Sequence, residues 1–214
     1  MRVFAGVVLV LSVACSRGMV SVSGDEGKGI KPFKLDVTEV TVAAYAECVK
    51  AGKCTEPSTG EKECNWGVSG KDQHPVNCVD FEQAAIYCQT FRGKRLPTGP
   101  EWEWAASNGG RTKFPWGDSG PDQFKAKWKS RDGTASVGSH PAGANSSGIQ
   151  DLSGNVREWT ATICPKNSFF QQYQEFQTRG GTYWWGNEAD FRADASACDV
   201  PWKVQSDIGF RCAE

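Results

Sequence analysis

The order of hydrophobic and polar residues predicts short regular elements separated by long polar stretches. Residues 32–36 alternate between the two classes, which is typical of a strand. Three helices are predicted, over residues 42–51, 81–91 and 101–107. Each follows a side-chain oxygen that can accept a hydrogen bond from the first helical turn, at Thr41, Asp80 and Thr98. Gln83 and Glu101 lie three positions after the last two of these, so both helices begin with the pattern of a capping box.

The region between residues 109 and 148 has no helical period and is rich in glycine, proline and polar residues. Irregular stretches of this length are uncommon in a folded domain unless disulfides or bound ions order them. Short β-like segments return near the C-terminus, over residues 179–185 and 208–213. We therefore expect an α+β fold with a single domain and little regular secondary structure.

The N-terminus has the pattern of an export signal. Arg2 precedes an apolar run over residues 3–14, too short for a membrane-spanning helix of about 20 residues. Cys15 follows Leu-Ser-Val-Ala, which resembles the lipobox of bacterial lipoproteins, where the cysteine becomes the lipidated first residue. Serine stands where that motif usually has leucine, and an ordinary cleaved signal is the alternative.

These features predict three segments: a signal peptide over residues 1–14, a flexible tether over 15–29 and a folded domain over 30–214. The mature protein would be exported and lipid-anchored at the cell envelope, on the outer surface or in the periplasm.

Cysteine is unusually frequent, with nine residues in 214. Without Cys15 eight remain, an even number that can pair completely in an oxidising compartment. They are Cys48, Cys54, Cys64, Cys78, Cys88, Cys164, Cys198 and Cys212. No two of them have the C-x-x-C spacing of a zinc ribbon or a thioredoxin-type site. The sequence therefore predicts a disulfide-rich protein and leaves the connectivity open.

Charge and histidine content count against two classes of function. Lys and Arg number 24 against 25 Asp and Glu, so there is no basic excess to attract nucleic acid. His74 and His140 are the two histidines of the whole sequence, too few for a histidine-rich metal centre. We expect no nucleic-acid partner and no histidine-based metal catalysis.

Seven short blocks occur in order along the chain. They lie at residues 38–41 (Thr-Glu-Val-Thr), 74–80, 93–106, 114–117, 154–159 (Gly-Asn-Val-Arg-Glu-Trp), 179–183 and 209–212 (Gly-Phe-Arg-Cys). Together they resemble the formylglycine-generating enzyme family, also called sulfatase-modifying factors, over about residues 20–214. The resemblance implies one complex domain of C-type-lectin-like topology.

The resemblance also implies a structural calcium site in the block that follows Gly148. The family's ligands there are an Asn or Asp side chain, two backbone carbonyls and a Glu side chain, which correspond to Asp151, Gly154, Val156 and Glu158. Calcium takes six to eight oxygen ligands of these kinds. A surface turn in which Glu158 pairs with an arginine is the alternative.

The positions that correspond to the family's catalytic residues carry other side chains. Its two copper(I)-binding cysteines correspond to Trp185 and Asp190, and the histidine after the first corresponds to Gly186. Copper(I) prefers soft thiolate ligands, which neither an indole nor a carboxylate supplies. The iron-dependent branch of the family uses a histidine cluster that two histidines cannot form. We therefore expect no copper cofactor and a pseudoenzyme.

One disulfide is implied by the resemblance. In the family a cysteine of the second helix bonds to the cysteine of Gly-Phe-Arg-Cys, and these correspond to Cys88 and Cys212. Three further pairs are hypotheses from their places in the chain: Cys48–Cys54 after the first helix, Cys64–Cys78 in the polar insertion, and Cys164–Cys198 near the end.

The leading hypothesis for function is a non-catalytic binding module. Where the enzymes have their cleft, this chain has aromatic and adaptable polar side chains, which suit recognition of a peptide, protein or glycan outside the cytoplasm. The predicted ligand-binding residues are Thr182, Tyr183, Trp184, Trp185, Asn187, Asp190, Arg192 and Arg157. The alternative for Trp184 and Trp185 is that both are buried and fill a defunct pocket.

Two other functions stay open on the sequence. An oxidoreductase of the formylglycine-generating type with rearranged chemistry would act on protein cysteine, and it needs a free reactive thiol. A diversified surface receptor of a diversity-generating retroelement would share the fold and the lipid anchor. Its variable surface would lie within residues 184–207.

Overall fold

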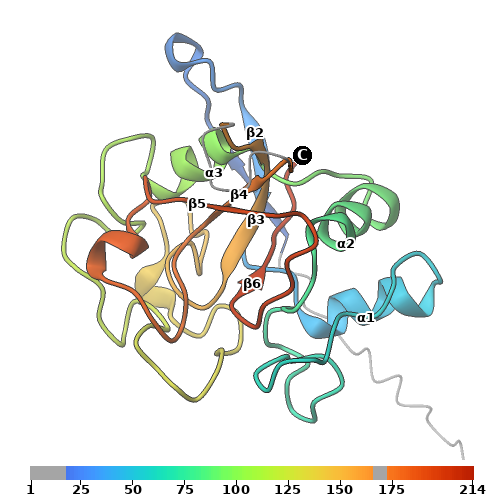
Figure 1. Cartoon of the computed structure of the whole chain (residues 1–214). Coiled ribbons are helices and arrows are strands. Elements are labelled where there is room, and N and C mark those ends of the chain that lie inside the picture. Colours follow the sequence, from blue (N-terminus) through green and yellow to red (C-terminus); the bar gives the residue numbers. More distant parts are fainter. Residues whose placement is uncertain (1–17, 166–172) are drawn as a thin grey trace, which may run out of the picture.

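The computed structural model describes residues 18–165 and 173–214 (Figure 1). The strands are β1 (Met19–Val22), β2 (Phe33–Asp36), β3 (Arg157–Ile163), β4 (Phe176–Arg179), β5 (Ala197–Asp199) and β6 (Ile208–Gly209). The α-helices are α1 (Val42–Lys50), α2 (Phe81–Ile86) and α3 (Gly99–Ala106). A π-helical turn (Tyr87–Phe91) continues α2, and 3-10 turns lie at Glu26–Lys28, Pro141–Gly143 and Glu188–Phe191. The α+β prediction is confirmed, and the segment 109–148 is mostly irregular, as expected.

Side-chain caps begin the three α-helices where the sequence predicts them. Thr41, Asp80 and Thr98 each accept a hydrogen bond from a backbone N–H of the following turn. The last two form complete capping boxes with Gln83 and Glu101. α3 begins at Gly99, two residues earlier than predicted, because Pro100 fits the first turn, where its missing N–H costs no hydrogen bond.

The main sheet has four strands in the order β5-β4-β3-β6, with β3 antiparallel to β4 and parallel to β6. The β-like segment predicted over residues 179–185 is wrong beyond Arg179, because Gly180 and Gly181 adopt φ values of 110° and 70°, outside the strand region. Of the segment 208–213, β6 alone pairs with β3, and Ala213 instead bridges to Leu35 of β2. β3 itself, the centre of the sheet, is an element that the sequence did not predict.

The flexible tether predicted up to residue 29 is wrong in most of its length. β1 pairs antiparallel with β2, from Met19 opposite Asp36 to Val22 opposite Phe33, and the hairpin projects from the domain (Figure 1). Val22 belongs to a buried cluster with Leu35 and Trp102. The folded domain therefore includes β1, while Cys15 and the predicted signal peptide lie outside the described residues. Among the described residues, every helix is too short or too polar to span a bilayer.

Two hydrophobic clusters form the core. One gathers Tyr45, Tyr87, Trp159 and Phe210 beneath α1 and α2, and the other gathers Leu35, Trp102, Ile149 and Leu152 beneath α3. Trp102 is fully buried, whereas Trp104 on the same helix is partly exposed, so Trp102 is the tryptophan of α3 that anchors the core. β3 reaches both clusters, because Trp159 lies in the first and Glu158 accepts a hydrogen bond from Trp102 Nε1 at 2.9 Å.

All eight cysteines outside the N-terminal segment form disulfides. The pairs are Cys48–Cys54, Cys64–Cys78, Cys88–Cys212 and Cys164–Cys198, so the four pairings considered from the sequence are confirmed. Cys164–Cys198 ties the end of β3 to β5, and Cys88–Cys212 ties the helical half to the C-terminus. Each disulfide thus fixes at least one cysteine that lies outside the helices and strands.

Candidate functional site

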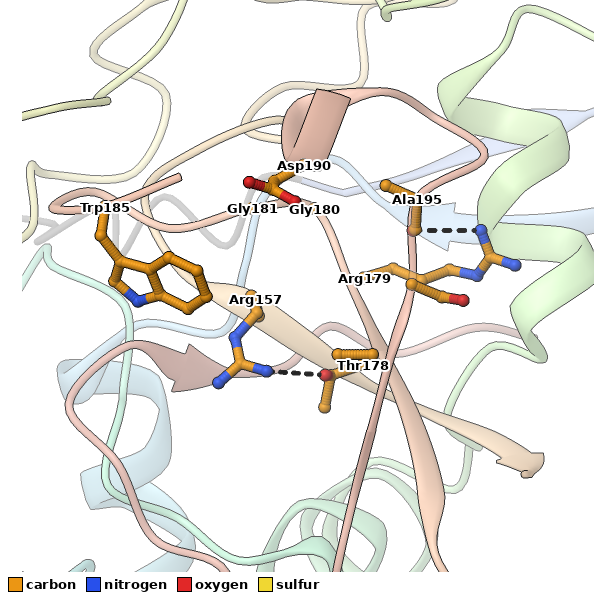
Figure 2. Close-up of a pocket in the computed structure, with 10 residues that line it drawn as sticks. Arg157, Thr178, Arg179, Gly180, Gly181, Trp185, Asp190 and Ala195 are labelled. Carbon is orange, nitrogen blue, oxygen red and sulfur yellow. Dashed lines mark hydrogen bonds between the residues drawn. The ribbon is translucent and has the colours of Figure 1, made fainter. Parts of the chain in front are cut away.

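A pocket of about 80 Å³ opens on the main sheet beside the loop that follows β4 (Figure 2). Strands supply Arg157, Thr178, Arg179 and Ala197, the 3-10 turn Glu188–Phe191 supplies Asp190, and the loops supply Gly180, Gly181, Trp185, Ala195 and Ser196. In Figure 2, Trp185 comes from the loop after β4 and Asp190 from the 3-10 turn Glu188–Phe191, whereas Arg157, Thr178 and Arg179 come from the strands. Space for several waters makes this pocket large enough for one small chemical group of a ligand.

A tight turn carries Trp185 to the pocket. Thr182 Oγ1 accepts hydrogen bonds from the backbone N–H groups of Trp184 and Trp185, both at 3.3 Å. Gly181 is needed inside the turn, since a Cβ there would lie 2.8 Å from the Phe191 ring and its φ is 70°. Asp190 accepts from the backbone N–H of Asn187 at 2.6 Å, which fixes its carboxylate at the rim.

Arg157 forms the floor of the pocket and is held by acidic groups behind it. Its Nη1 donates to Asp199 at 2.9 Å and to Thr178 at 3.1 Å, and its Nη2 lies 3.4 Å from Asp207. Burial alone would raise the pKa of Asp199, but Arg157, Lys203 and Thr178 together lower it below its ordinary value. The guanidinium of Arg157 therefore joins β3 to β4 and β5 through these contacts, and it also lines the pocket.

Arg179 is the second buried cation of the pocket. It forms an ion pair with Glu103 of α3 at 2.9 Å and donates to the carbonyl of Ala193 at 3.1 Å. Burial lowers the pKa of Arg179, and the nearby Glu103 offsets part of that effect. Two arginines and one rim carboxylate thus make a polar pocket, with the Trp185 indole as its large apolar surface.

Three of the eight predicted ligand-binding residues, Arg157, Trp185 and Asp190, line this pocket. Thr182 and Tyr183 do not, because both are buried: Thr182 caps the turn and Tyr183 donates to Ser206 at 3.3 Å. Arg192 points to Asp194, with which it forms an ion pair at 2.8 Å. Asn187 is exposed beside the pocket, outside its lining.

The sequence missed the lining residues Thr178, Arg179 and Ala195 to Ala197. They reach the pocket through the pairing of β4 with β5, a tertiary contact that no local pattern encodes.

Trp184 and Trp185 form an exposed aromatic pair. Their side chains are 50% and 48% exposed, and the ring centroids lie 6.2 Å apart in an edge-to-face arrangement. The alternative that both are buried fillers is therefore wrong. A second loop supports this surface, because Ser130 N donates to the Tyr183 carbonyl at 2.7 Å and Trp128 packs edge-on against Phe191.

The ordered blocks and the fold have counterparts among known proteins. The family described as the sulfatase-modifying factor enzyme 1-like domain matches residues 15–214. The chain belongs to this family.

Two members of the sulfatase-modifying-factor family show how similar this sequence is to its relatives. The inactive C-alpha-formylglycine-generating enzyme 2 of Bos taurus is 31% identical over 164 residues, covering 69% of this chain and 52% of that protein. The formylglycine-generating enzyme of Bos taurus is 30% identical over 224 residues, covering 88% of this chain and 56% of that protein. The chain thus spans about half the length of these relatives.

Solved structures show the same fold at low sequence identity. CarF superposes with a TM-score of 0.68 at 21% identity, covering 92% of this chain and 93% of CarF. Variable protein 1 of Treponema denticola gives 0.64 at 21% identity, covering 91% and 94%. The U1 variant of the Major Tropism Determinant gives 0.53 at 16% identity, covering 92% and 52%. The sulfatase-modifying-factor domain described here therefore has a C-type-lectin-like fold.

The residues predicted to bind calcium lie in one tight, buried segment of this domain. Asp151 and Asn155 have φ values of 57° and 60°, and Glu158 is fully buried. Both Glu158 carboxylate oxygens accept hydrogen bonds from Arg211 at 2.7 Å, so the alternative of a pairing with arginine holds for Glu158, although the group is not at the surface. Asp151 Oδ2 accepts from the Gly138 N–H at 2.5 Å.

The charge around this segment bears on whether a cation fits. Burial raises the pKa of Glu39 well above its usual value, the nearby carboxylates of Asp151 and Glu158 add to this effect, and the buried guanidinium of Arg211 opposes it. Carboxylate oxygens are among the ligands that calcium prefers. Within the described residues, however, no three His, Cys, Asp or Glu side chains converge as a metal cluster would require. A calcium ion here would depend on backbone carbonyls, as the predicted set of Asp151, Gly154, Val156 and Glu158 does.

Proposed function

We propose that this protein is a non-catalytic binding module of the sulfatase-modifying-factor family, exported and anchored through a lipid on Cys15. The observation that carries the proposal is the pair of residues at the pocket. The resemblance matches the family's copper-binding cysteines to Trp185 and Asp190, and both line the pocket beside Arg157. An indole and a carboxylate bind copper(I) poorly and form no thiol intermediate.

The state of the cysteines also supports a module without redox chemistry. An oxidoreductase with rearranged chemistry needs a reactive thiolate. Every cysteine among residues 18–165 and 173–214 is in a disulfide. The remaining Cys15 has the sequence context of a lipidation site, and incorporation of a labelled fatty acid that a Cys15→Ser variant loses would test that assignment.

The ligand we propose is a peptide or glycan outside the cytoplasm, contacted by Trp184, Trp185 and the polar rim at Asp190. Half-exposed indoles are costly to leave in water, and they give large contact area at low cost in side-chain entropy. Arg157 and Arg179, fixed on rigid strands by their protein partners, line the same pocket and give it positive charge.

The Trp184→Ala and Trp185→Ala variants test this surface. On peptide and glycan arrays we expect each to lose binding by about tenfold or more, since aromatic hot-spot residues contribute at least about 2 kcal/mol. Trp202→Ala is the matched control, because Trp202 is also an exposed tryptophan, at 55%, and does not line the pocket. Equal binding by all three variants would remove the pocket from the proposal.

Conversion of a cysteine to an aldehyde in a sulfatase-derived peptide by the purified protein would contradict the non-catalytic assignment.

A diversified surface receptor is the second candidate. Its support is that the proposed variable region over residues 184–207 includes Trp185, Asp190 and the Ala195–Ala197 wall of the pocket. Structural neighbours include proteins named as variable protein and as tropism-determinant variants. A near-copy of this region beside a reverse-transcriptase gene would support this candidate, and its absence from the surrounding DNA would exclude it.

The proposal includes a structural calcium ion at Asp151, Gly154, Val156 and Glu158. We expect millimolar calcium, compared with a chelator, to raise the melting temperature by several degrees, since saturating ligand at 100 times Kd adds about 2.7 kcal/mol. The Asp151→Ala variant should lose this shift, whereas Asp194→Ala, an exposed carboxylate, should keep it. Identical melting with calcium and with chelator would refute the ion.

A further inference from the structure

A second groove, of about 520 Å³, lies away from the pocket described above. It lies between the N-terminal hairpin and the C-terminal end of α3 and shares no lining residue with that pocket. β1 and the turn after it supply one wall, over residues 21–25. Trp104, Asn108, Arg111 and residues 145–147 supply the other wall.

The strand along this groove has a free edge. In the described part of the chain, β1 has β2 as its one strand neighbour. The other edge of β2 is taken by the C-terminus, because Lys34 N donates to the Glu214 carbonyl and Asp36 N to the Cys212 carbonyl, both at 2.9 Å. The groove therefore borders an edge strand, and edge strands accept further strands.

The register shows which β1 groups lie on that edge. Ser21 pairs with Lys34, whose N–H and C=O both turn away from β1 to bond Glu214. Residues opposite each other in an antiparallel pair either both bond across it or both point outward. The N–H and C=O of Ser21 consequently point away from β2, toward the groove side. The Ser23 carbonyl, two residues further along, also points away from β2. It accepts a hydrogen bond from Trp104 Nε1 at 2.8 Å.

The opposite wall is rigid and carries a positive charge. Asn108 Oδ1 accepts from Ser146 N, and Asn145 Oδ1 from Ile149 N, both at 2.8 Å, so this wall is formed before any ligand arrives. Arg111 is exposed and has no ion pair with any described residue. Lys28 lies nearby, with its Nζ 4.9 Å from the Trp104 ring centroid. On the β1 wall, the carboxylate of Asp25 accepts a hydrogen bond from the Gly27 N–H at 2.9 Å and keeps its negative charge, so a positive charge lies on the Arg111 wall alone.

From this geometry we infer that the groove binds an extended, acidic peptide segment of a partner protein, added as a strand to β1. The main-chain groups of Ser21 supply the strand pairing. Arg111 supplies a counter-charge for a Glu or Asp side chain of the peptide. The Trp104 indole, already hydrogen-bonded to Ser23 and approached by Lys28 and Gly109, forms the floor rather than a free platform for a sugar ring.

The experiment is a titration of the uniformly ¹⁵N-labelled protein with the capped peptide acetyl-Thr-Val-Thr-Glu-Thr-Val-amide, followed by NMR. We expect amide shifts along residues 21–25 and 108–111. Ser21→Pro removes the edge N–H without touching a β1–β2 hydrogen bond and should weaken binding by about tenfold, the effect of losing a main-chain hydrogen bond and strand fit. Ser21→Ala keeps that N–H and should bind as the parent protein does.

Two further arms keep the inference testable if Ser21→Pro disturbs the hairpin. A peptide N-methylated at alternate residues should lose binding to the parent protein, because it lacks the pairing donors. A peptide with Lys in place of Glu should bind several-fold more weakly, and Arg111→Gln should abolish that difference. Equal binding of all peptides, or shifts confined to residues outside the groove, would overturn the inference.

Discussion

Replacing Arg211 by methionine is expected to lower the free energy of unfolding by about 3–5 kcal/mol, because it leaves buried carboxylates without a counter-charge. Arg211 is fully buried and donates from Nε and Nη2 to the two Glu158 oxygens at 2.7 Å. Its Nη1 and Nη2 also donate to the carbonyls of Asp36 and Gln150, at 3.1 and 2.9 Å. Methionine fills much of the volume but restores none of these bonds. Urea unfolding of the two proteins measures the difference.

Arg192→Met is the control for this prediction. Arg192 and Asp194 form an ion pair at 2.8 Å, but their side chains are 39% and 57% exposed. An exposed pair contributes no more than about 1 kcal/mol, so the control should change stability little. A small effect of Arg211→Met would mean that Glu158 takes up a proton or a metal ion in place of the guanidinium. Repeating the urea unfolding at low pH and with calcium separates these two outcomes.

The second large effect is expected from the Cys88–Cys212 disulfide. Its two cysteines are 124 residues apart in the sequence, so its removal frees a long loop in the unfolded chain. Chain-entropy estimates for a loop of this length give a loss of about 5 kcal/mol for the double alanine variant. Both cysteines are also fully buried in the first core cluster, which adds a cavity cost. Thermal and chemical unfolding should both report the loss.

The Cys48–Cys54 disulfide gives the matched comparison. It closes a separation of 6 residues, for which the same estimate gives about 2 kcal/mol. The double alanine variant of this pair should therefore be clearly the milder of the two. If the two variants were equally stable, loop length would not be what makes the long disulfide important.

Local chemistry made the helix starts predictable from sequence. A cap needs one oxygen within a turn of the helix, so Thr41, Asp80 and Thr98 could be identified without knowledge of the fold. β3 could not be predicted from the sequence. Its first two residues are Arg157 and Glu158, and charged residues argue against a central strand. Their charges are matched by Asp199 and Arg211, which lie 42 and 53 positions further along the chain.

The candidate site was predictable to a similar extent. The resemblance matched Trp185 and Asp190 to one site, and they do line one pocket. Thr182 and Tyr183 have the side chains of ligand-binding residues, yet the fold uses both to hold the loop. Arg179 reaches the pocket through a strand whose end is set by Gly180, and its partner Glu103 belongs to a distant helix.

With the proposed lipid on Cys15, the early start of the first strand would limit how far this domain can stand from a membrane. A chain extends by at most about 3.6 Å per residue, so four steps separate Cys15 from Met19 by no more than about 15 Å. A lipid on Cys15 would hold the hairpin close to the lipid headgroups, because the tether between them would be short. Partners that reach the β1 edge would then be those that lie near the same bilayer surface.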